Sequence, residues 1–332
     1  MSGFKGEVMA YKLNILLFSI SIIVLAALLL YGNPGEVYQH ILQLDISTVA
    51  TLILLTLTGF SLRFIRFNIL LSRKYKTKIL KLFPVFVFGI SLANTTPGRL
   101  AEPVRALLIK RTLGIPVGYT LACIFLERLS DMLAIISFAL LAFIAVKAEL
   151  FIIPFFAVVL VILTVIIASQ YKKMYFTLTG LINKFLLFFS KIIFRDQLEM
   201  LARKISNLLK YTYSELKLGK SFLLQILFGV FIWGLVYPSI LYLSLQSLGA
   251  PTNFFSVVGI YNLSLIVGLA SFLPGGLGGT EAAITILLSL AGVEYSVALA
   301  ASIITRALSL WDVVLAGPIC ALFIKERKGK SS

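Results

Sequence analysis

The stretch SFLPGGLGGTEAA, residues 271–283, interrupts one of the most apolar parts of the chain. Proline and glycine break helices. Here Pro274 is followed closely by four glycines, Gly275, Gly276, Gly278 and Gly279. An acid, Glu281, follows after Thr280, although an isolated carboxylate is costly in lipid. Irregular backbone at membrane depth is tolerated only where protein or a water-filled cavity satisfies it. The stretch therefore predicts a helix that is broken inside a membrane and restarts near Thr280.

The composition agrees with a membrane protein, because hydrophobic residues make up 59% of the chain and charged residues only 13%. Ordinary soluble domains do not have this balance. Six apolar runs are long enough to cross a bilayer, at residues 13–31, 49–71, 117–146, 151–169, 222–248 and 296–324. Two shorter or interrupted runs remain, at 80–109 and 254–291. We predict an all-α polytopic membrane protein whose first run is an anchor, because no clean signal-peptide cleavage site follows it.

The net charge of +16 reports membrane topology and argues against a nucleic-acid partner. Lys and Arg cluster at 72–81, 109–111, 170–221 and 325–330, whereas the loops 32–47, 248–253 and 292–295 contain none. Basic loops stay in the cytoplasm, so we expect a multi-pass protein of the cell membrane with both termini cytoplasmic. The segment 170–221 is basic and amphipathic, which predicts helices lying on the cytoplasmic lipid surface. Docking of a partner is the alternative for this segment.

The topology also constrains the two interrupted runs. Six full spans place both ends on one side, so each interrupted run has to enter and leave the membrane on the same side. Basic clusters flank 80–109, and the two Lys/Arg-free loops flank 254–291. We therefore predict two re-entrant helical hairpins, the first from the cytoplasmic face and the second from the external face. Two short full spans at each place would preserve the same parity and remain the alternative.

The two interrupted runs resemble each other. Pro97-Gly98 aligns with Pro274-Gly275, Glu102 with Glu281, and Arg128 with Arg306, at nearly constant offsets. The alignment predicts one membrane domain over residues 1–332 that contains an inverted repeat, with residues 48–146 as the first repeat and 222–324 as the second. Inverted repeats with broken helices at the bilayer midplane are typical of transporters. Chance similarity between apolar segments is the alternative explanation.

Charged side chains within the apolar runs are few and grouped. The charged residues taken as site candidates are Arg99, Glu102, Arg105, Glu127, Arg128, Asp131, Glu281, Arg306 and Asp312. Because each unpaired charge is costly in the membrane, we expect them to face one another or a shared wet cavity. Together with the four glycines of the opening stretch, they form the predicted substrate-binding set. The free N–H groups of the restarted helix favour an anion such as phosphate, but a zwitterionic head group also suits the set. Structural pairing that locks the helices is the competing interpretation.

Three segments together resemble a known family. TTPGRLAEPVRALLIKR (95–111), ERLSDML (127–133) and FLPGGLGGTEAA (272–283) look like the signature segments of the lysylphosphatidylglycerol synthase transmembrane-region family, over about residues 13–325. In the related multiple-peptide-resistance proteins, a domain of this type moves an aminoacylated phospholipid between leaflets. The resemblance implies a lipid flippase or scramblase, acting on a phospholipid or a polyprenyl-phosphate-linked lipid. It also implies membrane lipids with anionic or zwitterionic head groups as partners.

Other functional classes have weaker support. An intramembrane transferase acting on a polyprenyl-phosphate or a phospholipid is the main alternative, with Glu127 and Asp131 as the carboxylates to hold Mg²⁺. A structural partner of a lipid-synthesising enzyme is another, and a homo-oligomer stays open. The single histidine and two cysteines favour neither a zinc site nor a Ser-His-Asp hydrolase. We therefore expect neither a metal nor a cofactor.

Overall fold

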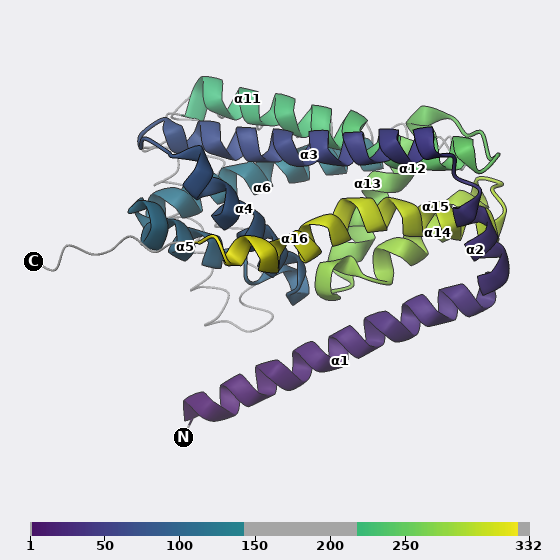
Figure 1. Ribbon diagram of the computed structural model, residues 1–332, viewed down its shortest axis with the longest axis horizontal. Coiled ribbons are helices and arrows are strands. Elements are labelled where there is room, and N and C mark those ends of the chain that lie inside the picture. The colour runs from purple at the N-terminus through teal and green to yellow at the C-terminus, as the bar shows by residue number, and fades with distance from the viewer. Residues whose placement is uncertain (1, 143–217, 325–332) are drawn as a thin grey trace, which may run out of the picture.

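The computed structural model describes residues 2–142 and 218–324, and every regular element in these two ranges is a helix (Figure 1). Three of the described helical segments are long and apolar enough to cross a membrane: Ile46–Ser72, Phe222–Ser247 and Tyr295–Ala321. They correspond to three of the predicted spans. The predicted span at 151–169 and the amphipathic segment at 170–221 lie outside the described residues. The protein is thus an all-helical membrane protein over the part that can be described.

The N-terminal helix makes few contacts with the rest of the bundle. α1 (Ser2–Tyr31) runs along one edge of the bundle and meets α2 (Pro34–Leu42) at a bend of 86° (Figure 1). Asn33 makes the bend with a left-handed φ of 55° and caps α2, since its side chain accepts a hydrogen bond from the Gly35 N–H. The sequence predicted the end of the first span but treated residues 32–47 as a loop, so α2 was missed.

Two of the three long spans contain a wider helical turn. α3 (Ile46–Ser72) is continuous and begins at Asp45, whose carboxylate accepts the Thr48 N–H as a helix cap. The second span joins α11 (Leu218–Phe231) to α12 (Tyr237–Ser247) through the π-helical turn η3 (Ile232–Val236). The third joins α15 (Tyr295–Arg306) to α16 (Asp312–Ala321) through the π-helical turn η5 (Ala307–Trp311). Such π turns often occur at functional sites.

Both interrupted runs fold as helix, break and helix. The first consists of α4 (Ile79–Asn94), the short 3₁₀ turn η1 (Pro97–Arg99) and α5 (Val104–Leu113), and it leads into α6 (Val117–Ala139). The second consists of α13 (Phe254–Ala270), η4 (Pro274–Gly276) and α14 (Gly279–Leu290). Both breaks fall at the predicted Pro-Gly pairs. Gly98 and Gly275 have almost the same left-handed conformation, with φ of 56° and 60°, which glycine adopts at little cost.

Each hairpin packs against a long helix from the other half of the chain. α4 lies against α16 and α13 lies against α6, while the two tips η1 and η4 contact each other. Small residues permit the close approach: the Ser91 hydroxyl of α4 donates to the Val314 carbonyl of α16 at 3.2 Å, and a side chain at Gly317 would collide with Ser91. Small residues at helix contacts are the usual means of close packing in membranes. The crossed packing brings both tips to the middle of the bundle.

Candidate functional site

The two hairpin tips meet around a cavity of about 230 Å³, here called the tip cavity. Its walls come from α3, α6, α13, the π turns η3 and η5 with the adjoining ends of α12 and α15, and both tips. Four arginines and two carboxylates line it: Arg63, Arg99, Arg128, Arg306, Glu102 and Asp131. Uncharged polar residues also line it, among them Asn94, Thr96, Tyr237, Tyr261, Thr280 and Ser309. Positive groups outnumber negative ones on its wall, so the charge of the tip cavity favours an anion.

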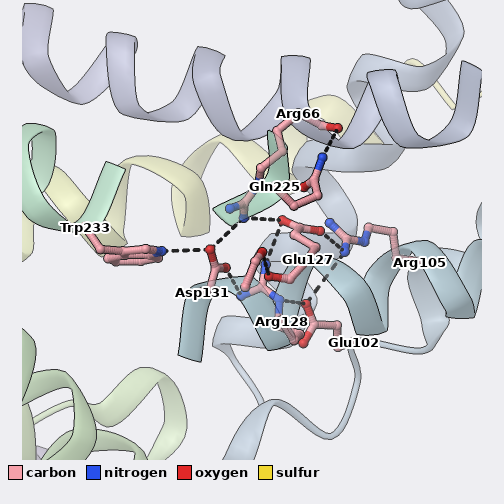
Figure 2. A network of polar contacts seen from close by, with 9 residues as sticks. Arg66, Glu102, Arg105, Glu127, Arg128, Asp131, Gln225 and Trp233 are labelled. Carbon is pink, nitrogen blue, oxygen red and sulfur yellow. Dashed lines mark hydrogen bonds and ion pairs between the residues drawn. The ribbon is translucent and has the colours of Figure 1, made fainter. Parts of the chain in front are cut away.

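A buried carboxylate organises the arginines behind the first tip. Glu127 of α6 is fully buried and accepts contacts from Arg105 Nη2 at 2.7 Å, Arg128 Nη2 at 2.7 Å and Arg66 Nη2 at 3.4 Å (Figure 2). The guanidinium of Arg105 also lies over the ring of Phe67, 4.2 Å from its centre. Glu127 and Arg105 do not line the tip cavity. Their geometry is that of a structural cluster that orients Arg128.

One turn further along α6, Asp131 links this cluster to the second half of the chain. Its Oδ1 contacts Arg66 Nη2 at 2.7 Å and accepts a hydrogen bond from Trp233 Nε1 at 2.8 Å (Figure 2). Its Oδ2 lies 3.3 Å from Arg128 Nη1. The π turn η3 carries Trp233, which also lines the tip cavity. Because the indole ring of Trp233 lines the tip cavity, its fluorescence should change when a ligand binds there.

The two tips carry matching ion pairs. At the first tip, Arg128 Nε lies 3.1 Å from Glu102 Oε1, and at the second, Arg306 Nε lies 3.1 Å from Glu281 Oε1. These are the pairs that the sequence alignment placed in equivalent positions. Arg306 also donates from Nη2 to the Gly275 carbonyl oxygen at 2.6 Å. In both halves, an arginine of the long helix thus holds the hairpin of its own half.

Two further arginines of the tip cavity lack such partners among the described residues. Arg63 of α3 is only 3% exposed, and its Nε and Nη2 are buried without a hydrogen-bond partner in that part of the chain. The side chain of Arg99 makes no ion pair with any residue described here. Arg99 also has a left-handed φ of 59°, which is uncommon outside glycine and costs about 1–2 kcal/mol. Unpaired charge and backbone strain at one site point to a binding function.

Most of the predicted site residues come together, but not all of them. Those that line the tip cavity are Arg99, Glu102, Arg128, Asp131, Gly275, Gly276 and Arg306. Glu281 is buried in the first turn of α14 and does not line the tip cavity. It forms an ion pair with Arg306, which does line the cavity. The spacing of Arg99, Glu102 and Arg105 by three residues predicts one helix face. The structure does not have this face, because Arg99 ends the 3₁₀ turn η1 and α5 begins only at Val104.

Three of the predicted residues lie elsewhere. Gly278 is close to α1, since a Cβ there would lie 3.0 Å from Val24. Gly279 faces Ser271 in its own hairpin, where a Cβ would lie 2.9 Å from the hydroxyl oxygen. Asp312 is half-buried at the start of α16 and does not line the tip cavity. These two glycines therefore permit close packing and have no contact with the tip cavity.

The sequence reasoning missed two arginines of α3, Arg63 and Arg66. Both are almost fully buried, and they lie in the stretch SLRFIRFNI of an otherwise apolar run. The signal was present, because charges inside a membrane span are rarely accidental. The aromatic wall, formed by Trp233, Tyr237 and Tyr261, had no comparable signal, since such residues are common on any membrane helix.

The arrangement suits binding by arginine more than binding by metal. Within residues 2–142 and 218–324, no three histidine, cysteine or acidic side chains gather as a metal site requires. Glu127 and Asp131, the two carboxylates considered for Mg²⁺, are both held by arginines. Chemically, the tip cavity offers fixed guanidinium groups, which recognise phosphate oxygens through paired hydrogen bonds.

Comparison with known proteins identifies relatives over nearly the whole chain. Residues 15–317 match the family described as the lysylphosphatidylglycerol synthase TM region. A UPF0104 membrane protein of Methanothermobacter thermautotrophicus is 27% identical over 312 residues, covering 91% of each chain. One from Pyrococcus horikoshii is 26% identical over 330 residues, covering 94% of this chain and 97% of the relative. No solved structure shows a significant match.

Proposed function

Because the chain belongs to the family of the lysylphosphatidylglycerol synthase transmembrane region, we propose that it moves a lipid between the two leaflets of a membrane. The observation that carries the proposal is the pair of matching ion pairs, Arg128–Glu102 and Arg306–Glu281, on two broken hairpins that share one cavity. Pockets for whole drug-sized ligands are roughly 300–1,000 Å³. The smaller tip cavity suits a polar head group, while the hydrocarbon chains of the lipid stay in the bilayer.

The proposed mechanism uses the two hairpins as alternating gates. In this scheme, residues 48–146 and 222–324 are inverted repeats, and each hairpin enters from one face of the membrane. Separation of Arg128 from Glu102 would release the first tip, and separation of Arg306 from Glu281 would release the second. An arginine that leaves its glutamate is then free to bind the head group. The phosphate of the head group would then replace the glutamate as the partner of the arginine, so that the arginine stays paired through this step.

Reconstitution into liposomes tests the proposal. A fluorescent phospholipid is placed in both leaflets, and a membrane-impermeant reductant bleaches the outer leaflet only. Wild-type protein should let bleaching proceed beyond the outer half, and Arg306→Gln should slow this step strongly. Lys81→Gln, which removes an exposed positive charge from α4, is the matched control and should behave as wild type. No bleaching beyond the outer half by any folded preparation, with any of several head groups, would refute lipid translocation.

The same vesicles separate transport from chemistry. Lipids extracted after the assay should be unchanged by mass spectrometry. A new covalent lipid product would instead support the transferase alternative.

The orientation of the chain belongs to the proposal and has its own test. Ser47 and Ser72 are exposed residues at opposite ends of α3. In intact cells, a cysteine at Ser47 should react with an impermeant thiol reagent, whereas one at Ser72 should react only after the cells are opened. The reverse pattern would place both hairpins on the wrong faces.

A further inference from the structure

Arg63 and Arg99 identify the chemical class of the ligand. Both line the tip cavity, and they come from different parts of the fold: Arg63 from α3, and Arg99 from the tip of the first hairpin. Every other arginine in or behind the tip cavity already has a carboxylate partner: Arg66, Arg105, Arg128 and Arg306. Arg63 is almost fully buried and has no carboxylate partner among the described residues, and a buried charge of this kind within a membrane span is by default a functional one.

The carboxylates of the tip cavity also favour an anionic ligand, because they are already paired with arginines. The two acids on the wall of the tip cavity, Glu102 and Asp131, are both in ion pairs with Arg128, and Asp131 is also held by Arg66. A head group with an ammonium or an aminoacyl group would need an available acid. Among the described residues that line the tip cavity, each acid already has an arginine partner, whereas two arginines do not have an acid.

We propose that the tip cavity binds the phosphate of an anionic lipid head group that carries no amine, with Arg63 and Arg99 as the anchoring residues. This assignment rests on the proposed function and specifies its substrate class. The phosphate oxygens supply the hydrogen-bond acceptors that Arg63 Nε and Nη2 lack. Arg99 lies on the tip of the first hairpin, which moves in the proposed gating scheme, so binding of the head group would link this tip to α3.

The left-handed backbone of Arg99 strengthens the assignment. The equivalent position of the second tip is Gly276, which has a similar φ of 69°. Glycine is the residue that this conformation favours, and there a Cβ would lie 2.8 Å from Thr280 Oγ1. The first tip carries an arginine where the backbone prefers glycine, so a guanidinium is placed in the tip cavity despite the strain. Only one of the two tips therefore presents a cation.

Binding can be measured with the full chain in detergent, without transport. Trp233 lines the tip cavity, and the only other tryptophan is Trp311. In a Trp311→Phe background, the indole fluorescence therefore reports on the tip cavity alone. The probes are short-chain dioctanoyl-phosphatidylglycerol, dioctanoyl-phosphatidylcholine, dioctanoylglycerol and inorganic phosphate. We expect saturable binding of the phosphatidylglycerol, competition by high inorganic phosphate, and much weaker binding of the zwitterionic and phosphate-free lipids.

The arginine variants test the assignment directly. Arg63→Gln and Arg99→Gln should each weaken phosphatidylglycerol binding by roughly 10- to 100-fold, the range for losing one hydrogen bond between charged groups. Arg63→Lys keeps the charge without the fork and should lie in between, while Lys81→Gln should bind as wild type. If the folded Arg63→Gln and Arg99→Gln variants bind phosphatidylglycerol as tightly as wild type, the assignment is overturned.

Results with phosphatidylcholine and inorganic phosphate could also contradict the assignment. Phosphatidylcholine bound as tightly as phosphatidylglycerol would overturn the amine-free head group, and inorganic phosphate binding that no lipid displaces would make the ligand a soluble anion. Arginine-dependent lipid binding without leaflet exchange would refute the proposed function and leave the phosphate site standing.

Discussion

Arg99→Gly should stabilise the protein and impair it at the same time. Arg99 has a left-handed φ of 59°, which costs an L-residue about 1–2 kcal/mol. Glycine removes this cost but loses about 0.5–1 kcal/mol to the entropy of the unfolded chain. The net stabilisation should be about 0.5–1 kcal/mol. Arg99→Ala is the matched control, because it also lacks the guanidinium but keeps the Cβ and hence the strain.

The two variants separate backbone from side chain. Unfolding by sodium dodecyl sulfate in mixed micelles, followed by far-UV circular dichroism, should rank Arg99→Gly above both Arg99→Ala and wild type. Lipid translocation in liposomes should fall in both variants to a similar degree, because a hydrogen bond between charged groups is worth about 1.5–3 kcal/mol. A glycine variant that is less stable than the alanine variant would disprove the strain. Full transport by both variants would show that the guanidinium at the tip is not used.

Four further predictions concern other parts of the chain. Glu127→Gln should destabilise the protein by about 3–5 kcal/mol in the same unfolding assay, because it breaks a buried cluster of ion pairs. Arg306→Gln should slow lipid translocation while most of the protein still folds, as judged by gel filtration in detergent. Gly276→Val should impair folding or transport far more than Leu277→Val, because Gly276 has a φ of 69° and is in close contact with its neighbours. Hydrogen bonds from the Ser47 and Thr48 hydroxyls and the Thr48 N–H lower the pKa of Asp45 from 3.8 to about 2. The stability that Asp45 contributes is thus complete above about pH 4 and is lost as the pH falls through 2, and Asp45→Asn should flatten this part of a stability–pH profile.

Each of the four has an outcome that would contradict it. A loss below about 1 kcal/mol for Glu127→Gln would mean that its three arginines find other partners. Wild-type transport by Arg306→Gln would remove the second gate from the scheme. Equal behaviour of the Gly276 and Leu277 variants would reduce the tip to an ordinary turn. If Asp45→Asn loses stability between pH 4 and pH 2 as wild type does, other carboxylates cause that loss.

Much of the architecture was predictable because it follows from local rules. Pro-Gly pairs cannot continue a helix, so both breaks were placed correctly at Pro97 and Pro274. The near-constant spacing between the halves also aligned Glu102 with Glu281 and Arg128 with Arg306. The structure adds that each of these arginines pairs with the glutamate of its own half. These features depend on a few residues each, so a single sequence is sufficient to find them.

The parts that were missed depend on packing between distant segments. The local sequence does not show whether a glycine such as Gly278 faces a cavity or a neighbouring helix. In the structure, Gly278 packs against α1. The partners of Arg66 come from α6, and Arg63 lines a cavity that it shares with α6 and the tips, all far away in the sequence. Such features require the tertiary structure.

The crossed packing of the hairpins has a consequence for how the protein is made. α4 is complete at Asn94, but α16, the helix that covers it, begins only at Asp312, roughly 220 residues later. At ~5–20 residues per second of synthesis, the first hairpin waits ~10–40 s for its final neighbour. During that interval its breaks and buried charges are without their final surroundings in the membrane. A chain whose synthesis stops in the second half would therefore leave the first hairpin without α16, and a second half made separately should restore this contact.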